Sequence, residues 1–352
     1  MPARRPAVLF QIHNRRGLGH LMRGLNIARE IRALAPDGEV VFYTRSEAAA
    51  EFRPPGIRHI VESDPTAPTH WPEAVRAVAP DVVVYDTILP RDPEAEPVPP
   101  SIRVAYIMRR CQEEQQRAVF AHRWLDRVDE ILVPHEPGEF GYELPPRLRA
   151  RTTFVGPIVR LPDPEGQARL RERYRLRQGD FVLTSTVGGG GFGAQADAFF
   201  EAVFAVHRRV TSVRPLRHLV IQGPNYGRAL APLPGMTVVA VEPDIVNLLA
   251  ISDLAIAEGG YNTVNEVRAT RTPGVFLPSR RSVDDQEERV RALEVRGLAR
   301  VLAGVEPEEV AALVETLCTS ATALPDMRSR YAGDRMVIGN RAAAERILGL
   351  CR

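Results

Sequence analysis

A histidine beside two glycines is the first feature of this sequence that could do chemistry. His20 lies in the segment HNRRGLGHLMRG, residues 13–24, where Gly17 and Gly19 would let the backbone turn tightly. Its imidazole can accept a proton near neutral pH, so His20 is our first candidate for a general base. Arg23 follows one helical turn later, and we place it with the two glycines on the acceptor or phosphate side of a site. A turn that merely needs glycine beside a solvated histidine is an equally open interpretation.

A run of glycines is the second feature. The segment TSTVGGGGFGA, residues 184–194, contains Gly188, Gly189, Gly190, Gly191 and Gly193. A purely structural turn needs only one or two glycines. We therefore predict that backbone amides of this loop bind the phosphates of a ligand, with a flexible linker as the alternative.

The third feature places a carboxylate after a glycine pair. The segment AEGGYNTVNEVRA, residues 257–269, contains Gly259, Gly260, Asn262 and Thr263 before Glu266. The glycine pair would end a strand, the polar pair would cap or open the helix that follows, and Glu266 would lie one turn further on the same face. A diphosphate would meet the helix N-terminus while Glu266 accepts both hydrogens of a ribose diol. A solvated helix acid is the alternative for Glu266.

Three more side chains could contact a sugar or accept a proton. Asp285 and Gln286 open a helix after a predicted strand and loop, and they offer acceptors and an amide donor that suit sugar hydroxyls. Ordinary acids at the start of a helix are the alternative. Asp86, which ends the run VVVYD, is our second candidate base, and a helix cap or a turn is its alternative.

A parallel sheet would bring these residues together. Short apolar runs alternate with amphipathic stretches, a pattern that predicts an α/β fold with doubly wound parallel sheets. Strands are expected at 7–13, 39–44, 57–61, 81–86, 102–108 and 130–134, and again at 181–187, 217–223, 236–242, 252–258 and 273–278. Each glycine segment follows such a strand, so its residues would lie at the carboxyl edge of a sheet, where ligands bind.

The chain of 352 residues is long enough for two domains, each with its own core. The pattern of strand, glycine loop and helix begins again after the Pro/Gly-rich stretch at 155–166, which suits a linker. We place one domain at 1–157 and a second at 158–330. We expect the helix within 331–352 to pack back toward the first domain.

Composition excludes several kinds of protein. All 46 basic side chains are arginine, which excludes a Schiff-base lysine, a P-loop and the lysine of a protein kinase. The arginines are interspersed with 44 acids, a pattern that argues against nucleic-acid binding. Three distant cysteines, Cys111, Cys318 and Cys351, indicate neither a disulfide framework nor a thiolate metal site and fit a reducing cytoplasm.

Other absences concern metals and membranes. The sequence has no HExxH, no EF-hand pattern and no Asp-x-Asp pair, so we expect neither a metal nor a cofactor. No run of about 18 apolar residues is present, and we expect no transmembrane helix. Peripheral contact with a membrane stays open.

The order of the motifs resembles a known family. A GxGH loop, a VGxxVR linker, a second glycine loop, GGxxTxxE and a helix-opening Asp-Gln are similar to those of GT-B glycosyltransferases. The similarity is greatest to the branch of the peptidoglycan N-acetylglucosaminyltransferase and its bacterial relatives, and it is strongest at 181–300. It implies two Rossmann-like domains that face a central cleft, with the acceptor on the first and the nucleotide-sugar donor on the second.

The resemblance also implies roles by position. Residues 188–193 would face the diphosphate, Glu266 would hold the ribose, Asp285 and Gln286 would contact the donor sugar, and His20 would lie at the reaction centre. The implied reaction is metal-independent transfer of a sugar from a UDP- or dTDP-linked donor to a hydroxyl acceptor. The acceptor would be a natural product or a lipid-linked molecule of the cell envelope.

One departure keeps other reactions open. Arg23 stands where the peptidoglycan enzyme has proline, and the resulting GHxxR is similar to nucleotide-sugar hydrolases of sialic-acid-like pathways. Hydrolysis of the donor is therefore the alternative reaction. A related epimerase and a non-catalytic nucleotide-sugar-binding protein are further alternatives.

Overall fold

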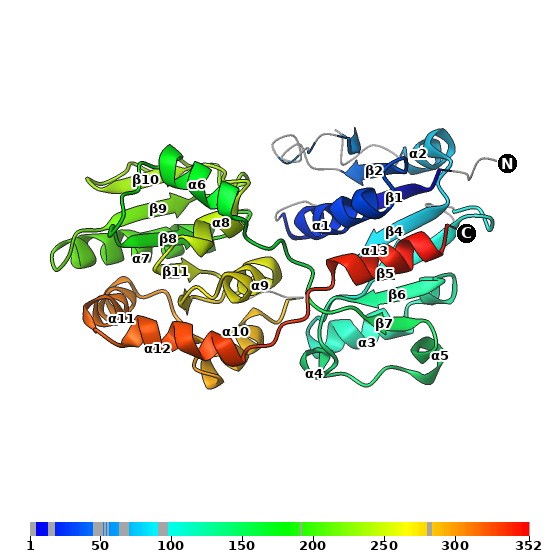
Figure 1. The fold of residues 1–352 in the computed structure, drawn as a ribbon. Helices are drawn as coiled ribbons and strands as arrows, with labels where there is room; N and C mark the ends of the chain where they lie inside the picture. Colours follow the sequence, from blue (N-terminus) through cyan, green and yellow to red (C-terminus); the bar gives the residue numbers. More distant parts are fainter. Residues whose placement is uncertain are drawn as a thin grey trace. The chain divides into compact units, whose positions relative to one another are not determined.

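The structure is a computed structural model, and it describes residues 5–12, 18–44, 52, 54, 56–62, 70–90, 98–190, 192–279 and 284–351. The chain divides into two units, each built on its own sheet (Figure 1). Unit 1 is Met1–Val159 together with Val337–Arg352, and unit 2 is Arg160–Met336. Within the described residues every strand pair of both sheets is parallel, which confirms the predicted α/β class.

The sheet of unit 1 has the strand order β3-β2-β1-β4-β5-β6-β7. Its strands are β1 (Ala7–Ile12), β2 (Glu39–Thr44), β3 (Arg58–Val61), β4 (Val82–Asp86), β5 (Arg103–Ile107), β6 (Glu130–Val133) and β7 (Thr152–Phe154). Its helices are α1 (Gly19–Leu34), α2 (Trp71–Val78), α3 (Glu113–Ala121), α4 (Pro137–Phe140), α5 (Pro146–Arg149) and α13 (Asn340–Gly349), with a 3-10 turn η2 at Arg123–Asp126. The central strands are apolar and almost wholly buried, as expected where helices cover both faces of a parallel sheet.

The sheet of unit 2 has the order β10-β9-β8-β11-β12-β13. Its strands are β8 (Val182–Thr186), β9 (Arg217–Ile221), β10 (Met236–Val239), β11 (Leu254–Ala257), β12 (Gly274–Phe276) and β13 (Ala299–Val301). Its helices are α6 (Pro164–Arg173), α7 (Gly193–Thr211), α8 (Ile245–Ala250), α9 (Tyr261–Thr270), α10 (Gln286–Val295), α11 (Pro307–Thr319) and α12 (Ala323–Arg330), with a 3-10 turn η3 at Tyr331–Gly333.

The strand order of each sheet reverses at one point. The reversal lies between β1 and β4 in unit 1 and between β8 and β11 in unit 2. In doubly wound sheets, ligands bind beside such a switch point, at the carboxyl ends of the strands. The predicted site segments follow these four strands, apart from the Asp285–Gln286 pair, which lies after β12.

Two strands were not predicted from the sequence. β7 (TTF) and β13 (ARV) lie at the sheet edges and include polar side chains, so neither forms an apolar run like that of the equally short β12 (GVF). The predicted helical stretch near the C-terminus is divided, because α12 and η3 belong to unit 2 and α13 belongs to unit 1. In unit 1, α13 packs against α1 and Arg346 pairs with Glu130 of β6 at 2.8 Å and 2.9 Å.

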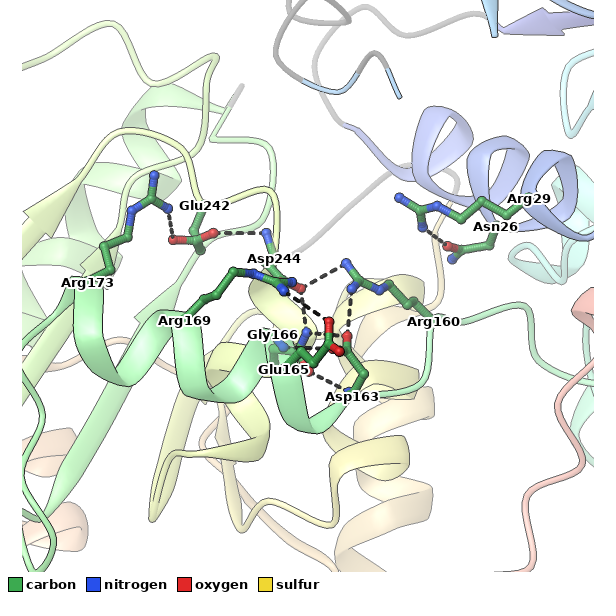
Figure 2. Close-up of polar contacts among 11 residues, drawn as sticks. Asn26, Arg29, Arg160, Asp163, Glu165, Gly166, Arg169, Arg173, Glu242 and Asp244 are labelled. Carbon is green, nitrogen blue, oxygen red and sulfur yellow. Dashed lines mark hydrogen bonds and ion pairs between the residues drawn. The ribbon is translucent and has the colours of Figure 1, made fainter. Parts of the chain in front are cut away.

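Fixed polar contacts hold the first residues of unit 2. Arg160 donates to Asp163 at 2.9 Å and to Asp244 at 2.8 Å (Figure 2). The buried Asn247 amide donates to the same two carboxylates, at 2.9 Å each. Asp163 also caps α6 by accepting from the Gly166 N–H at 2.7 Å. The polypeptide therefore enters unit 2 through a defined network instead of a loose linker.

Candidate functional site

The predicted site residues of unit 1 gather at the end of β4. His20 and Arg23 lie at the start of α1, which Gly19 begins, and Asp86 is the last residue of β4. The sheet brings them together because β1, which precedes α1, pairs directly with β4. Gly17, the other glycine of that predicted loop, lies outside the described residues.

Asp86 accepts hydrogen bonds on both of its carboxylate oxygens. Arg23 donates from Nε to Oδ2 at 3.0 Å and from Nη2 to Oδ1 at 2.5 Å. The Nδ1 of His20 lies 3.2 Å from the same Oδ1. Arg23 and Asp86 are 2% and 1% exposed, whereas the His20 side chain is 23% exposed. The arrangement is a buried two-bond ion pair with an imidazole at its accessible end.

The charge state of Asp86 follows from these neighbours. Burial alone would raise its pKa, but the Arg23 guanidinium, the His20 ring and their hydrogen bonds hold the pKa of the carboxyl well below its usual range. A carboxyl that stays ionised is a weak proton acceptor. The geometry therefore indicates that Asp86 positions its neighbours and does not act as the base.

Thr87 completes this group, and sequence reasoning missed it. Its hydroxyl donates to Asp86 at 2.8 Å and accepts from Arg23 at 3.0 Å. Its φ is +62°, a region that β-branched residues rarely adopt and that costs about 1–3 kcal/mol. The Tyr106 hydroxyl donates to the Thr87 carbonyl at 2.9 Å and helps to hold this conformation. The only signal in the sequence was its place directly after Asp86.

In unit 2, the glycine run after β8 packs against the loop after β9. Gly190 has a φ of +72°, and a Cβ there would come 2.6 Å from the Gln222 carbonyl oxygen. Gly223 has a φ of +84°, and its Cβ would come 2.4 Å from the Gly188 carbonyl oxygen. Close packing of two loops therefore explains part of the glycine run, a reason that the phosphate prediction did not include.

The remaining glycines of the run differ in what they offer a ligand. The N–H of Gly188 already donates to the Thr186 hydroxyl at 3.0 Å, and the carbonyl of Gly189 accepts a backbone N–H of the neighbouring loop at 3.0 Å. Gly193 begins α7, whose first turn has no side-chain cap among the described residues. Gly191 lies outside the described residues. The start of α7 is thus the part of this loop best suited to an anion.

The third glycine segment leads into α9. Gly260 is the residue before the helix, and a Cβ on Gly259 would come 2.8 Å from a methyl carbon of α10. Asn262 and Thr263 lie in the first turn of α9, and the residue at the cap position is Gly260, which has no side chain. The Thr263 hydroxyl lies 3.9 Å from where a Cβ on Gly188 would stand, so α9 begins next to the glycine run.

Glu266 is a buried carboxylate of α9. It is 8% exposed, and no donor lies within hydrogen-bond distance of its carboxylate in the part of the chain that the structure describes. Burial raises the pKa of Glu266 to about 7. The alternative of a solvated helix acid is therefore wrong. A group of this kind can accept hydrogen bonds from a ligand once it is ionised.

Arg289 engages the acidic start of α10. Its guanidinium pairs with Asp285 and donates to the Gly259 carbonyl at 2.7 Å. The Gln286 side-chain oxygen accepts from the Ser279 hydroxyl at 3.3 Å. Asp285 thus forms an ion pair with a residue of its own helix. The prediction that Asp285 offers a free acceptor to a sugar did not include this pairing. The four-residue spacing of Asp285 and Arg289 was the available signal.

The described residues contain neither a metal-binding cluster nor a membrane-spanning helix. No three His, Cys, Asp or Glu side chains come together there in a way that could hold a metal ion. None of the helices there is long and apolar enough to span a membrane.

Comparison with known proteins identifies the class of protein. Residues 190–337 match the glycosyltransferase family 28 C-terminal domain. Over 363 residues the chain is 27% identical to the UDP-N-acetylglucosamine–N-acetylmuramyl-(pentapeptide) pyrophosphoryl-undecaprenol N-acetylglucosamine transferase of Symbiobacterium thermophilum, covering 95% of this chain and 94% of that enzyme. It is also 31% identical to the enzyme of the same name from Exiguobacterium over 163 residues, which is 42% of this chain and 43% of that enzyme.

Solved structures share the fold. The kitacinnamycin glycotransferase superposes with a TM-score of 0.63 at 16% identity, covering 99% of this chain and all of that one. SnogD from Streptomyces nogalater gives 0.59 at 16% identity with the same coverage. The chain is a GT-B glycosyltransferase related to the peptidoglycan N-acetylglucosaminyltransferases. The resemblance inferred from the motifs is therefore confirmed. In this GT-B glycosyltransferase the predicted site residues fall into the two groups described above, one in each unit.

Proposed function

We propose that this glycosyltransferase moves a sugar from a UDP- or dTDP-linked donor to a hydroxyl group, without a metal, with the donor on unit 2 and the acceptor on unit 1. The names of the relatives from Symbiobacterium and Exiguobacterium describe transfer from a UDP-linked sugar to a lipid-linked acceptor. The names of several solved structures refer to natural products. Both acceptor classes therefore belong in the test.

The contact between His20 and Asp86 carries the proposal. Because the ionised carboxylate of Asp86 is an acceptor, the 3.2 Å contact favours the His20 tautomer with the proton on Nδ1. Nε2 then has a free lone pair, and it has no partner among the described residues. In the proposed step Nε2 takes the proton of the acceptor hydroxyl while that oxygen attacks the anomeric carbon. The bond from this carbon to the diphosphate oxygen breaks, and the nucleoside diphosphate leaves.

Unit 2 supplies the groups for the leaving diphosphate. The first turns of α7 and α9 lie at the positive ends of the helix dipoles, where backbone N–H groups can bind an anion. Glu266, one turn into α9, would accept hydrogen bonds from the ribose diol in its ionised form. Neither role requires a lysine or a metal ion.

Hydrolysis is the competing reaction, since Arg23 suggested it. In the structure Arg23 is 2% exposed, and its guanidinium bonds to Asp86 and Thr87. Through these contacts Arg23 helps to hold Asp86, which orients the proposed base His20. Transfer and hydrolysis both need an oriented base. The presence of Arg23 therefore does not favour hydrolysis over transfer.

Product analysis with a donor panel tests the proposal. The protein would be incubated with UDP- and dTDP-linked sugars, with and without a polyprenyl-pyrophosphate saccharide or an aromatic natural-product acceptor. We expect nucleoside diphosphate to be released only when an acceptor is present, together with a glycosylated product detected by mass spectrometry. Equal release without acceptor would establish hydrolysis, and no turnover of any donor would contradict the proposal.

A further inference from the structure

A cavity of about 470 Å³ lies at the amino edge of the sheet in unit 2. Phe181, which directly precedes β8, and Asp253, which directly precedes β11, both line it. The candidate donor residues follow the same two strands at the opposite edge. Because β8 has 5 residues, at about 3.3 Å each the two edges are about 16 Å apart. The cavity is therefore separate from the candidate donor site.

Two contacts fix the guanidinium of Arg214 in the wall of this cavity. The guanidinium carbon lies 3.8 Å from the centre of the Phe181 ring, and Nη1 donates to the Cys318 carbonyl at 2.8 Å. Nε is buried, and neither Nε nor Nη2 has an acceptor among the described residues. A guanidinium is always charged and can donate to an oxygen of a carboxylate or phosphate. Two fixed contacts thus hold the positive charge of Arg214 in the cavity wall.

The charge of the cavity wall also favours an anion. Arg171 and Arg328 line the cavity with Arg214, against the two carboxylates of Asp180 and Asp253. Asp180 accepts from an arginine outside the cavity at 3.3 Å, and Asp253 accepts from a backbone N–H of β8 at 2.8 Å. Both carboxylates are thus partly satisfied, whereas Arg171 and Arg328 are exposed to solvent. The wall keeps a positive excess.

We propose that this cavity binds a small molecule through a phosphate or carboxylate group, held by the guanidinium of Arg214 in the cavity wall. Arg171 and Arg328 supply the remaining positive charge. The volume falls within the range of about 300–1,000 Å³ that is usual for small-molecule pockets. It is larger than a bare oxyanion needs, so the ligand carries further atoms beside its anionic group.

Calorimetric titration of the full chain tests this site. The probes are inorganic phosphate, glycerol 3-phosphate and succinate, which separate a bare ion, a phosphomonoester and a dicarboxylate. We expect one site per chain for glycerol 3-phosphate or succinate, with affinity above that for inorganic phosphate. Arg214→Gln should lower the affinity at least tenfold, because the amide carries no positive charge to bind the anionic group.

Other variants keep the test decisive if Arg214→Gln fails to fold. Arg171→Gln and Arg328→Gln change exposed side chains and should each weaken binding severalfold. Arg117→Gln, on α3 of unit 1, removes the same charge from another exposed helix and should leave the affinity unchanged. The proposal is overturned if the wild-type protein binds none of the probes at millimolar concentration. It is equally overturned if the Arg171, Arg214 and Arg328 variants all keep wild-type affinity.

Discussion

The two candidate sites differ in how each neutralises its buried carboxylate. In unit 1, Asp86 meets a guanidinium, an imidazole and a hydroxyl, and its pKa is held well below the usual range. In unit 2, Glu266 meets no donor within the described residues, and burial raises its pKa to about 7. The carboxylate of Asp86 therefore has its hydrogen-bond donors without a ligand, whereas the carboxylate of Glu266 has none among the described residues.

This difference indicates different tasks. A paired carboxylate fixes the positions of its partners, so Asp86 serves by orienting His20 and Arg23. A buried carboxylate without a partner lowers the stability of the free protein, and a ligand that donates hydrogen bonds to it can recover that free energy. We therefore expect changes at Asp86 to damage the fold and the reaction together, and changes at Glu266 to separate stability from ligand binding.

Asp86→Asn should have the largest effect on stability, because it removes the carboxylate that pairs with Arg23 and His20. The amide cannot neutralise the guanidinium of Arg23, which would stay buried and charged. Removing one partner of a buried ion pair lowers the free energy of unfolding by about 3–5 kcal/mol. Urea denaturation followed by circular dichroism measures this loss, and turnover should fall with it.

A double variant serves as the control for that loss. Arg23→Met with Asp86→Leu removes both charges and should recover most of the free energy of unfolding, since apolar pairs often replace buried ion pairs without cost. Turnover should stay low because His20 has lost its orienting carboxylate. Wild-type stability of Asp86→Asn alone would show that the ion pair does not hold this part of unit 1.

His20→Ala should have the next largest effect, and mainly on the reaction. Loss of the proposed base lowers turnover by about 10²-fold or more. Nucleotide affinity, measured by calorimetry, should stay unchanged because His20 belongs to unit 1. The matched control is His70→Ala, which alters an exposed histidine of the same unit. Turnover of the His20 variant at the wild-type rate would remove His20 from the mechanism.

Gly190→Ala should lower the free energy of unfolding by less than Asp86→Asn does. This variant tests whether loop packing requires glycine in the run. Its φ of +72° and the nearby Gln222 carbonyl oxygen strain any side chain, so we expect a loss of about 1–3 kcal/mol in the free energy of unfolding. Gly193→Ala is the matched control, because a Cβ there has no atom within 4 Å. It should leave the melting temperature nearly unchanged. Equal melting temperatures for both variants would mean that loop packing does not require glycine at 190.

Much of the fold could be predicted because its signals are local. Apolar runs such as VVVYD locate buried strands, and the glycine segments after β1, β8 and β11 mark the carboxyl edges. The edge strands β7 and β13 could not be predicted, since their short segments include polar side chains and form no apolar run. The division of the C-terminal helical stretch between two units depends on contacts of α13 with α1, which are distant in the sequence.

The candidate site was predicted in part, for a related reason. Residue types and spacing identified His20, Asp86 and Glu266, but not what each one touches. The pairing of Arg23 with Asp86 joins residues 63 positions apart, and it is this contact that changes Asp86 from a candidate base into an orienting group. Likewise, burial of Glu266 depends on tertiary packing, and no helical spacing would have shown that it lacks a partner.

Glu266→Gln should have the smallest effect among these variants, and it separates ligand binding from stability. The amide oxygen is a weaker acceptor than a carboxylate, so nucleotide affinity should fall about tenfold, as expected for the loss of a charge-assisted hydrogen bond. In the wild-type protein affinity should rise as the pH increases through about 7, because the ligand binds the ionised form. The variant should show no such rise. Calorimetry at pH 6 and pH 8 measures both trends.

Stability should move in the opposite direction. The pKa of Glu266 rises from 4.5 to about 7 on folding, so between these values the folded protein binds more protons than the unfolded chain. The free energy of unfolding therefore falls as the pH rises through this window, and Glu266→Gln lacks this contribution. The variant should be more stable than the wild type at pH 8 and bind nucleotide less tightly. A variant that loses both stability and affinity at pH 8 would mean that Glu266 has a structural partner, and the contrast with Asp86 would then disappear.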